Sequence, residues 1–337
     1  MASSRARHGR SCARSPSPRG ARADERERRG ALSDRDHRAF SGVGAASALL
    51  PHADVVLAVG TRYVMPPSGL SLPRPARPSS SSTSIPSRWD GTAGRITPSS
   101  VTRSADSPTS YRGFRGTTAR VPSRAGELRA LKAGLVEEMG RLSIQAEYAL
   151  AIRDVLPDDG VLVSESTQVG YWSQGGGFPV YEPRSFLTSG YQGTLGYGFA
   201  TALGAQVGNP HRKVVSINGD GGFFYNVQEL STMARHGIPL VAIVFNDNAY
   251  GNVRRIQQVR FNDHTIGSDL LNPDLVKLGE LFGVASSRAT NPRELRATLE
   301  QALASNAPHL IEVPMPPTLD VPQQFPMEPL PPRPVLA

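Results

Sequence analysis

Cysteine and lysine are both scarce in this chain of 337 residues. The single cysteine, Cys12, excludes an internal disulfide. No run of about eighteen apolar residues occurs, which excludes a hydrophobic transmembrane helix and leaves no reason to expect a membrane partner. We therefore expect a cytoplasmic protein.

The net positive charge comes from one part of the chain. A net charge of +8 and a pI near 10 would suggest a nucleic-acid partner. Residues 1–124, however, hold 21 Arg and no Lys against 8 acids, whereas the remainder is mildly acidic. Residues 1–124 offer only scattered aromatic side chains for base stacking. Nucleic-acid binding is therefore the least favoured function, and no nucleic-acid partner is expected.

Two long stretches lack the aliphatic residues that a core requires. Residues 1–28 and 66–125 are rich in Arg, Ser, Pro, Gly and Thr. Such a composition cannot bury enough apolar surface to offset the entropy lost on folding, which favours disorder. A second interpretation is out-of-frame translation of a GC-rich gene, which resequencing would exclude by finding an intact frame. Residues 315–337 form a Pro-rich tail.

Residues 29–65 have a globular texture between these two stretches. Small residues at Gly42–Leu50 indicate a helix, and the apolar run from Ala53 to Gly60 is typical of a buried parallel strand. We expect this part to be a partial Rossmann-like segment.

Residues 126–314 carry the strongest structural signals. Apolar strands alternate with helices, which predicts an α/β fold with a doubly wound parallel sheet and helices on both faces. The expected helices are 126–155, 195–207, 223–235, 274–282 and 292–304, and the expected strands are 161–164, 213–218, 239–246, 284–288 and 309–313.

Polar clusters follow three of these strands. They occupy residues 164–168, 218–222 and 246–251. In an open α/β sheet, ligands bind at the carboxyl ends of strands, where helix amino termini offer free N–H groups. We therefore expect the three clusters to form one site.

The second and third clusters predict a Mg²⁺ site. Gly219 and Gly221 allow close backbone approach to a phosphate, and Asp220 supplies a carboxylate oxygen. Asp247 follows 27 residues later at the end of the next strand. Mg²⁺ prefers one or two carboxylates together with phosphate and water oxygens. Taken alone, Asp220 is better explained as a turn residue that caps the following helix, and Asp247 could be only a strand-end turn residue.

This pairing resembles the signature of thiamin-diphosphate-dependent enzymes of the acetolactate synthase and benzoylformate decarboxylase type, which opens with Gly-Asp-Gly and closes with Asn-Asn. Here the closing pair is Asn246-Asp247. The resemblance implies thiamin diphosphate and Mg²⁺ as cofactors. It assigns the metal to the side chains of Asp220 and Asp247 and to the carbonyl of Ala249. The N–H groups around Gly221 and Gly222 would face the diphosphate, and Tyr250 would lie in the same site.

Two further segments resemble parts of the same family. Ser189–Ala202 resembles the segment that grips the aminopyrimidine, in which the Gly193 carbonyl and Leu195 N–H would bind the ring. The Leu195 side chain would support the bent cofactor. Glu165–Gln168 resembles a turn that contacts the diphosphate through Thr167 and Gln168. These residues are otherwise explained as core, helix cap and surface positions.

The resemblance implies an enzyme that makes or breaks carbon–carbon bonds next to a carbonyl in 2-oxo acids. Gly251-Asn252-Val253 departs from the Gly-Met-Val of biosynthetic acetolactate synthases, which favours a decarboxylase or carboligase. The family's activating glutamate lies in a domain that this chain does not contain, so no catalytic residue is assigned. Two alternatives follow: a cofactor-binding subunit of a split enzyme, or an inactive remnant. Intact relatives are expected to form dimers or tetramers.

Overall fold

The structure is a computed structural model that describes residues 29–41, 123–140, 144–190 and 192–316, with Leu49 and short strands at 22–24, 57–58, 80–81 and 97–98. Apart from these pieces, the expectations for residues 1–28, 42–65, 66–125 and 315–337 lie outside the described residues. No helix in the described ranges is long and apolar enough to cross a membrane.

A parallel sheet forms the centre of the described chain and confirms the predicted doubly wound fold. Its six strands run in the order β10-β11-β9-β8-β6-β7, and every neighbouring pair is parallel. The central strands are buried along nearly their whole length, as apolar strands covered on both faces should be. The strands are β6 (Val161–Ser164), β7 (Phe186–Thr188), β8 (Val214–Gly219), β9 (Val241–Asn246), β10 (Ala285–Arg288) and β11 (His309–Pro314).

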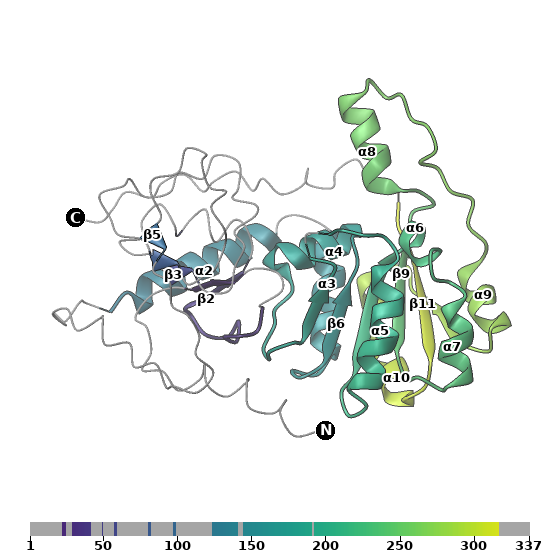
Figure 1. Cartoon of the computed structure of the whole chain (residues 1–337), viewed down its shortest axis with the longest axis horizontal. Coiled ribbons are helices and arrows are strands. Elements are labelled where there is room, and N and C mark those ends of the chain that lie inside the picture. Colours follow the sequence, from purple (N-terminus) through teal and green to yellow (C-terminus); the bar gives the residue numbers. More distant parts are fainter. Residues whose placement is uncertain are drawn as a thin grey trace.

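Helices cover both faces of this sheet (Figure 1). Alternate strand residues point to opposite faces, so each face has its own apolar cluster. One face packs against α3 (Ile144–Val155), α4 (Gln168–Trp172) and α10 (Pro292–Ser305). The other packs against α5 (Tyr197–Gly208), α6 (Asp220–Phe223), α7 (Glu229–Arg235) and α9 (Leu275–Leu281). Figure 1 shows α8 (Gly251–Arg260) extending away from the sheet.

Some predicted elements differ from the structure in their extent. The helix expected over 126–155 is two helices, α2 (Ala125–Gly140) and α3, because Gly140 ends the first one. The helix expected over 223–235 is likewise divided into α6 and α7 by a series of turns. Strand β7 was not predicted, since three residues are too few to show a periodic pattern.

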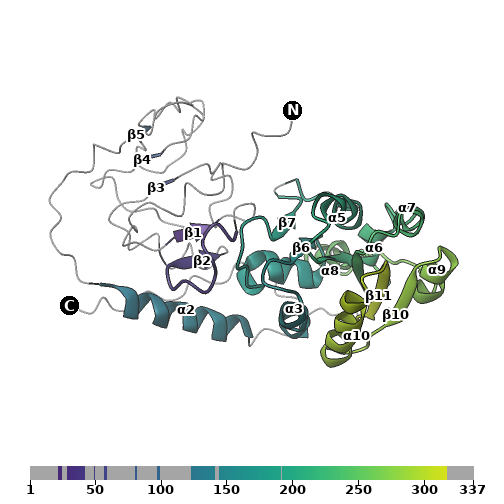
Figure 2. The ribbon, with the colours of Figure 1, turned by 90° about the horizontal axis from the view of Figure 1, so that it is seen from below.

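Residues 29–41 pack against the same body beside α2 (Figure 2). The Arg29 side chain is fully buried and donates to the carbonyl oxygens of Ser173, at 2.8 Å, and Phe178. Asp34 accepts a 2.8 Å hydrogen bond from the N–H of Val180. The two carbonyl acceptors of Arg29 belong to η4 (Ser173–Gly177) and to the residue after it, so residues 29–41 are anchored to this part of the fold.

Candidate cofactor site

The three predicted clusters converge at one edge of the sheet. They follow β6, β8 and β9, which are adjacent in the order β9-β8-β6. Gly219, at the end of β8, pairs in register with Phe245 near the end of β9. The chain after each strand therefore emerges at the same level, as parallel pairing requires.

Asp220 and Asp247 lie together at this edge. Asp220 is 2% exposed, Asp247 is partly buried, and the two carboxyl groups are neighbours that interact electrostatically. Burial raises the pKa of Asp220, and the neighbouring charge of Asp247 raises it further. Burial also raises the pKa of Asp247. Neighbouring carboxyl groups repel one another when both are ionised, and a divalent cation relieves that repulsion.

Side-chain amides bind each carboxylate from outside the pair. Gln168 Nε2 donates to Asp247 Oδ2 at 3.1 Å, and its own Oε1 accepts from Gln145 Nε2 at 2.9 Å. Asn272 Nδ2 donates to Asp220 Oδ2 at 2.6 Å. Gln168 was among the predicted site residues, whereas Gln145 and Asn272 were not. No pattern in the sequence marked either of them.

Asn272 belongs to a chain of hydrogen bonds, here called the amide relay: Arg288, Glu312, Asn246 and Asn272. Asn272 Nδ2 donates to Asn246 Oδ1 at 2.9 Å, and Asn246 Nδ2 donates to Glu312 Oε1 at 2.9 Å. Arg288 Nε in turn donates to Glu312 Oε2 at 2.9 Å. Since Glu312 accepts from Asn246 Nδ2, the relay fixes which end of the Asn246 amide faces Asn272.

Glycines allow the clusters to approach each other closely. A Cβ added at Gly221 would lie 2.6 Å from the ring of Tyr250, so that ring packs on the turn after β8. A Cβ at Gly251 would lie 2.4 Å from Asp247 Oδ2, while one at Gly219 would lie 3.5 Å from Thr167 Cβ. Ala249, 4% exposed, forms an antiparallel bridge with Asp269 beside Tyr250. The predicted residues of all three clusters thus share one site.

Gly193 and Leu195 stand apart from this group. They lie between β7 and α5, where a Cβ added at Gly193 would have no atom within 4 Å. Leu195 exposes 39% of its surface, so the alternative that it is an ordinary core residue does not hold. The segment connects to the rest of the site at Gly196, whose carbonyl accepts a 2.7 Å hydrogen bond from Asn226 Nδ2.

Glu165 is a buried carboxylic acid to which the sequence had assigned no role of its own. It is 1% exposed, and its Oε1 accepts from the N–H of Gly196. Burial raises its pKa to about 7, although backbone N–H groups at Gly196 and Gly198 act in the opposite direction. A Cβ added at Gly222 would lie 2.1 Å from Glu165 Oε1. Glu165 therefore occupies the space between α5 and the turn after β8.

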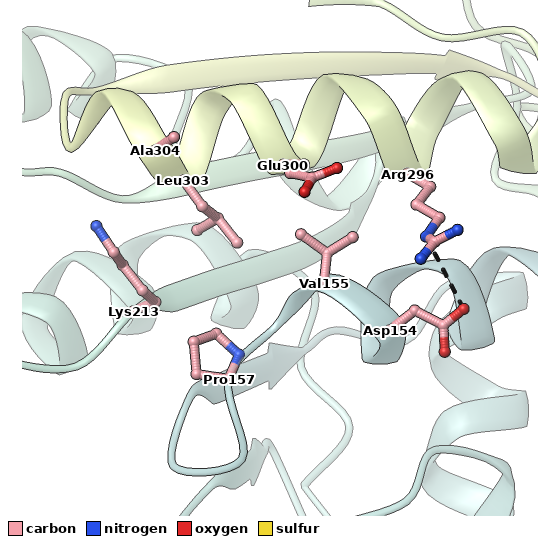
Figure 3. A pocket seen from close by; sticks show the side chains of 8 residues that line it. All are labelled: Asp154, Val155, Pro157, Lys213, Arg296, Glu300, Leu303 and Ala304. Atoms are coloured by element: carbon pink, nitrogen blue, oxygen red, sulfur yellow. Dashed lines mark ion pairs between the residues drawn. The ribbon is translucent and has the colours of Figure 1, made fainter.

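A surface pocket of about 290 Å³ lies elsewhere, between α3 and α10 (Figure 3). Arg296 and Asp154 form an ion pair at 4.0 Å on its rim. Lys213 and Pro157, which precede β8 and β6, place the pocket at the amino end of those strands. Ligands of open α/β sheets bind at the carboxyl ends, so the Asp220–Asp247 edge is the stronger candidate.

Comparisons with known proteins show which domain family this part of the chain resembles. Residues 166–313 match the family model described as the C-terminal TPP binding domain of thiamine pyrophosphate enzymes. The matched range contains all the predicted site residues, from Thr167 to Tyr250.

Curated relatives are acetolactate synthase subunits. The chain is 39% identical over 153 residues to a probable acetolactate synthase large subunit of Methanocaldococcus jannaschii, covering 45% of this chain and 25% of that protein. It is 35% identical over 173 residues to the acetolactate synthase large subunit of Parasynechococcus marenigrum, covering 50% and 27%. The chain thus spans about a quarter of the length of these relatives.

A solved structure shares the fold. It is the thiamine diphosphate-dependent 4-hydroxybenzoylformate decarboxylase of Rhodococcus jostii RHA1, with a TM-score of 0.63 and 22% identity. The likeness covers 89% of this chain and 57% of that one.

Proposed function

Because residues 166–313 belong to the C-terminal domain family of thiamine pyrophosphate enzymes, we propose that this chain binds thiamin diphosphate through Mg²⁺ at the Asp220–Asp247 edge. The observation that carries the proposal is the pairing of a buried and a partly buried aspartate, Asp220 and Asp247, which follow adjacent parallel strands and interact electrostatically.

The residues present fit such a metal. Mg²⁺ is bound in proteins by one or two carboxylates together with substrate phosphates and water. Asp220 and Asp247 are the two carboxylates, and the carbonyl of Ala249 is a further oxygen in the same cluster. Asn272 and Gln168 each donate to one carboxylate oxygen, which orients these carboxylates as outer hydrogen bonds do for metal ligands.

The remaining predicted residues divide between the two ends of the cofactor. Gly219, Gly221 and Gly222 flank Asp220 in the chain, and Thr167 lies beside Gly219. The backbone N–H groups of this turn would face the diphosphate. Gly193 and Leu195 lie on the separate segment before α5 and would receive the pyrimidine. Tyr250 packs on Gly221 and helps to shape the diphosphate side.

Thiamin diphosphate, when bound, supplies an electron sink for the carbon next to a carbonyl. The residues of this chain hold the metal and the diphosphate and orient the pyrimidine. We propose that the reaction served is the making or breaking of a carbon–carbon bond in a 2-oxo acid. The curated relatives support an acetolactate synthase-like reaction, and Gly251-Asn252-Val253 supports a decarboxylase-like one.

The matched segment covers about a quarter of the curated relatives, which bears on whether this chain can turn over substrate alone. The curated relatives are about four times longer than the matched segment, so we propose that a partner subunit completes the active site. Under this proposal the isolated chain binds the cofactor, and carbon dioxide release from pyruvate appears only when the partner is added. Cofactor binding without turnover in every mixture would instead identify an inactive remnant.

Isothermal titration of thiamin diphosphate into the full chain, with and without Mg²⁺, tests the binding proposal. We expect saturable binding that requires Mg²⁺ and is lost in Asp220→Asn. Asp247→Asn keeps an oxygen ligand and restores the family's Asn-Asn pair, so it should retain binding.

A matched control is Asp269→Asn, since the Asp269 side chain is 69% exposed and pairs with Arg254 instead. This variant should bind as the wild type does. Binding that is independent of Mg²⁺, or unaffected by Asp220→Asn in a folded protein, would refute the proposed site.

A further inference from the structure

Gly196 is held from both sides of its backbone. Its N–H donates to Glu165 Oε1, and its carbonyl accepts a 2.7 Å hydrogen bond from Asn226 Nδ2. Its φ of +81° is in the left-handed region that favours glycine. We call Glu165, Asn226 and Gly196 the Gly196 clamp. The two side chains come from different elements: Glu165 follows β6, and Asn226 lies in the turns between α6 and α7.

The surroundings of Glu165 are arranged to admit its carboxyl group. A Cβ at Gly222 would lie 2.1 Å from Glu165 Oε1, and one at Gly198 would lie 2.9 Å from Glu165 Cβ. Burying a carboxyl group is unfavourable unless hydrogen bonds compensate, and the raised pKa of Glu165 reflects that cost. An apolar side chain would fill this space without the cost, so the carboxyl group serves a purpose other than packing.

The clamp connects the two halves of the candidate site. Gly196 follows Leu195 directly, so its peptide orientation determines where the exposed Leu195 side chain is presented. Glu165 and Asn226 are in turn fixed to the β6 end and to the turns that follow Gly222. A clamp between these parts sets the position of the pyrimidine side relative to the diphosphate side.

We propose that Glu165 and Asn226 are positioning residues that hold Gly196, and through it Leu195, in register with the diphosphate turn. This inference rests on the proposed function. It adds that different residues set the affinity for the two ends of the cofactor. The Asp220–Asp247 edge binds the diphosphate, and the Gly196 clamp sets how much the pyrimidine end adds to the affinity.

The test compares two probes, thiamin diphosphate and inorganic pyrophosphate, each titrated with Mg²⁺ into the full chain. In Glu165→Ala and in Asn226→Ala we expect the dissociation constant for thiamin diphosphate to rise about tenfold or more, as loss of a buried hydrogen bond implies. The constant for pyrophosphate should stay within about threefold of the wild type. Glu165→Gln, whose amide oxygen can still accept from Gly196 N–H, should recover most of the lost affinity.

The ratio of the two constants is a readout that general destabilisation would not move. An equal loss for both probes, or no loss for thiamin diphosphate, overturns the clamp. If Glu165→Ala does not fold, Asn226→Ala decides the question alone, because Asn226 is only partly buried. A wild-type chain that binds neither probe would refute the proposed function itself, and the clamp would fall with it.

Discussion

Asn272 Nδ2 bridges Asp220 Oδ2, at 2.6 Å, and Asn246 Oδ1, at 2.9 Å, and so ties the loop after α8 to the ends of β8 and β9. Both protons of this amide are used, and its orientation is fixed by the rest of the amide relay. Asp220 is the main proposed metal ligand, so Asn272, which orients its carboxylate, should affect the affinity for Mg²⁺.

Asn272→Ala removes a side-chain amide that donates a hydrogen bond to Asp220 Oδ2. We expect the Mg²⁺ concentration needed for half-maximal binding of thiamin diphosphate to rise by about tenfold, since an outer hydrogen bond to a metal ligand contributes this much. Titration of Mg²⁺ at fixed cofactor measures the change. Thr265→Ala, at an exposed position earlier in the same loop, is the control, and an equal effect there would contradict the assignment.

Glu165→Gln should make the metal-free chain more stable, and increasingly so as pH rises. The folded-state pKa of Glu165 is raised from its usual 4.5 to about 7, so between these values the folded chain binds more protons than the unfolded chain. Its free energy of unfolding therefore falls as pH rises through this window, and a neutral Gln removes that loss. Thermal melts of both proteins in EDTA at pH 5, 6, 7 and 8 should show a melting-temperature difference of a few degrees that widens with pH. A difference that narrows with pH would contradict the raised pKa.

Arg29→Ala should destabilise the fold far more than Arg35→Ala. Arg29 is fully buried, donates to two carbonyl oxygens and lies 4.6 Å from the centre of the Phe186 ring. Its loss leaves those groups without a buried donor and should cost about 3 kcal/mol. Arg35 pairs with Asp158 where both side chains are more than half exposed and water screens the pair, so the loss of Arg35 should change the free energy of unfolding far less. Urea unfolding measures both, and equal values would show that residues 29–41 are not anchored by Arg29.

Gly222→Ala and Gly204→Ala should have opposite effects on stability. A Cβ at Gly222 would lie 2.1 Å from the Glu165 carboxyl, so this variant must displace a buried group and should lose about 2 kcal/mol or more. At Gly204, in α5, a Cβ would meet nothing within 4 Å, and Ala should gain roughly 0.5–1 kcal/mol from its higher helix propensity. Chemical denaturation of the two variants provides the comparison. A stable Gly222→Ala would mean that Glu165 can move aside.

The sequence by itself determined the doubly wound sheet and the convergence of its polar clusters. These follow from local signals: apolar runs for buried strands, helical spacing for their partners, and Gly-Asp-Gly or Asn-Asp where the strands end. Parallel pairing then brings Asp220 and Asp247 to one edge without further information, because the carboxyl ends of adjacent parallel strands must lie together. The family resemblance of residues 166–313 could be detected in the sequence because the same local motifs carry it.

Only the tertiary structure decided which side chains support that edge. Asn272 reaches Asp220 across 52 residues, and Asn246 reaches Glu312 across 66. Glu165 reaches Gly196 across 31 residues, and Asp34 reaches Val180 across 146. Asn272, Glu312 and Val180 carry no signal in the sequence that points to these partners. Their roles depend on packing that brings distant loops together. A buried polar group needs a hydrogen-bond partner, and only the folded structure shows which residue that partner is.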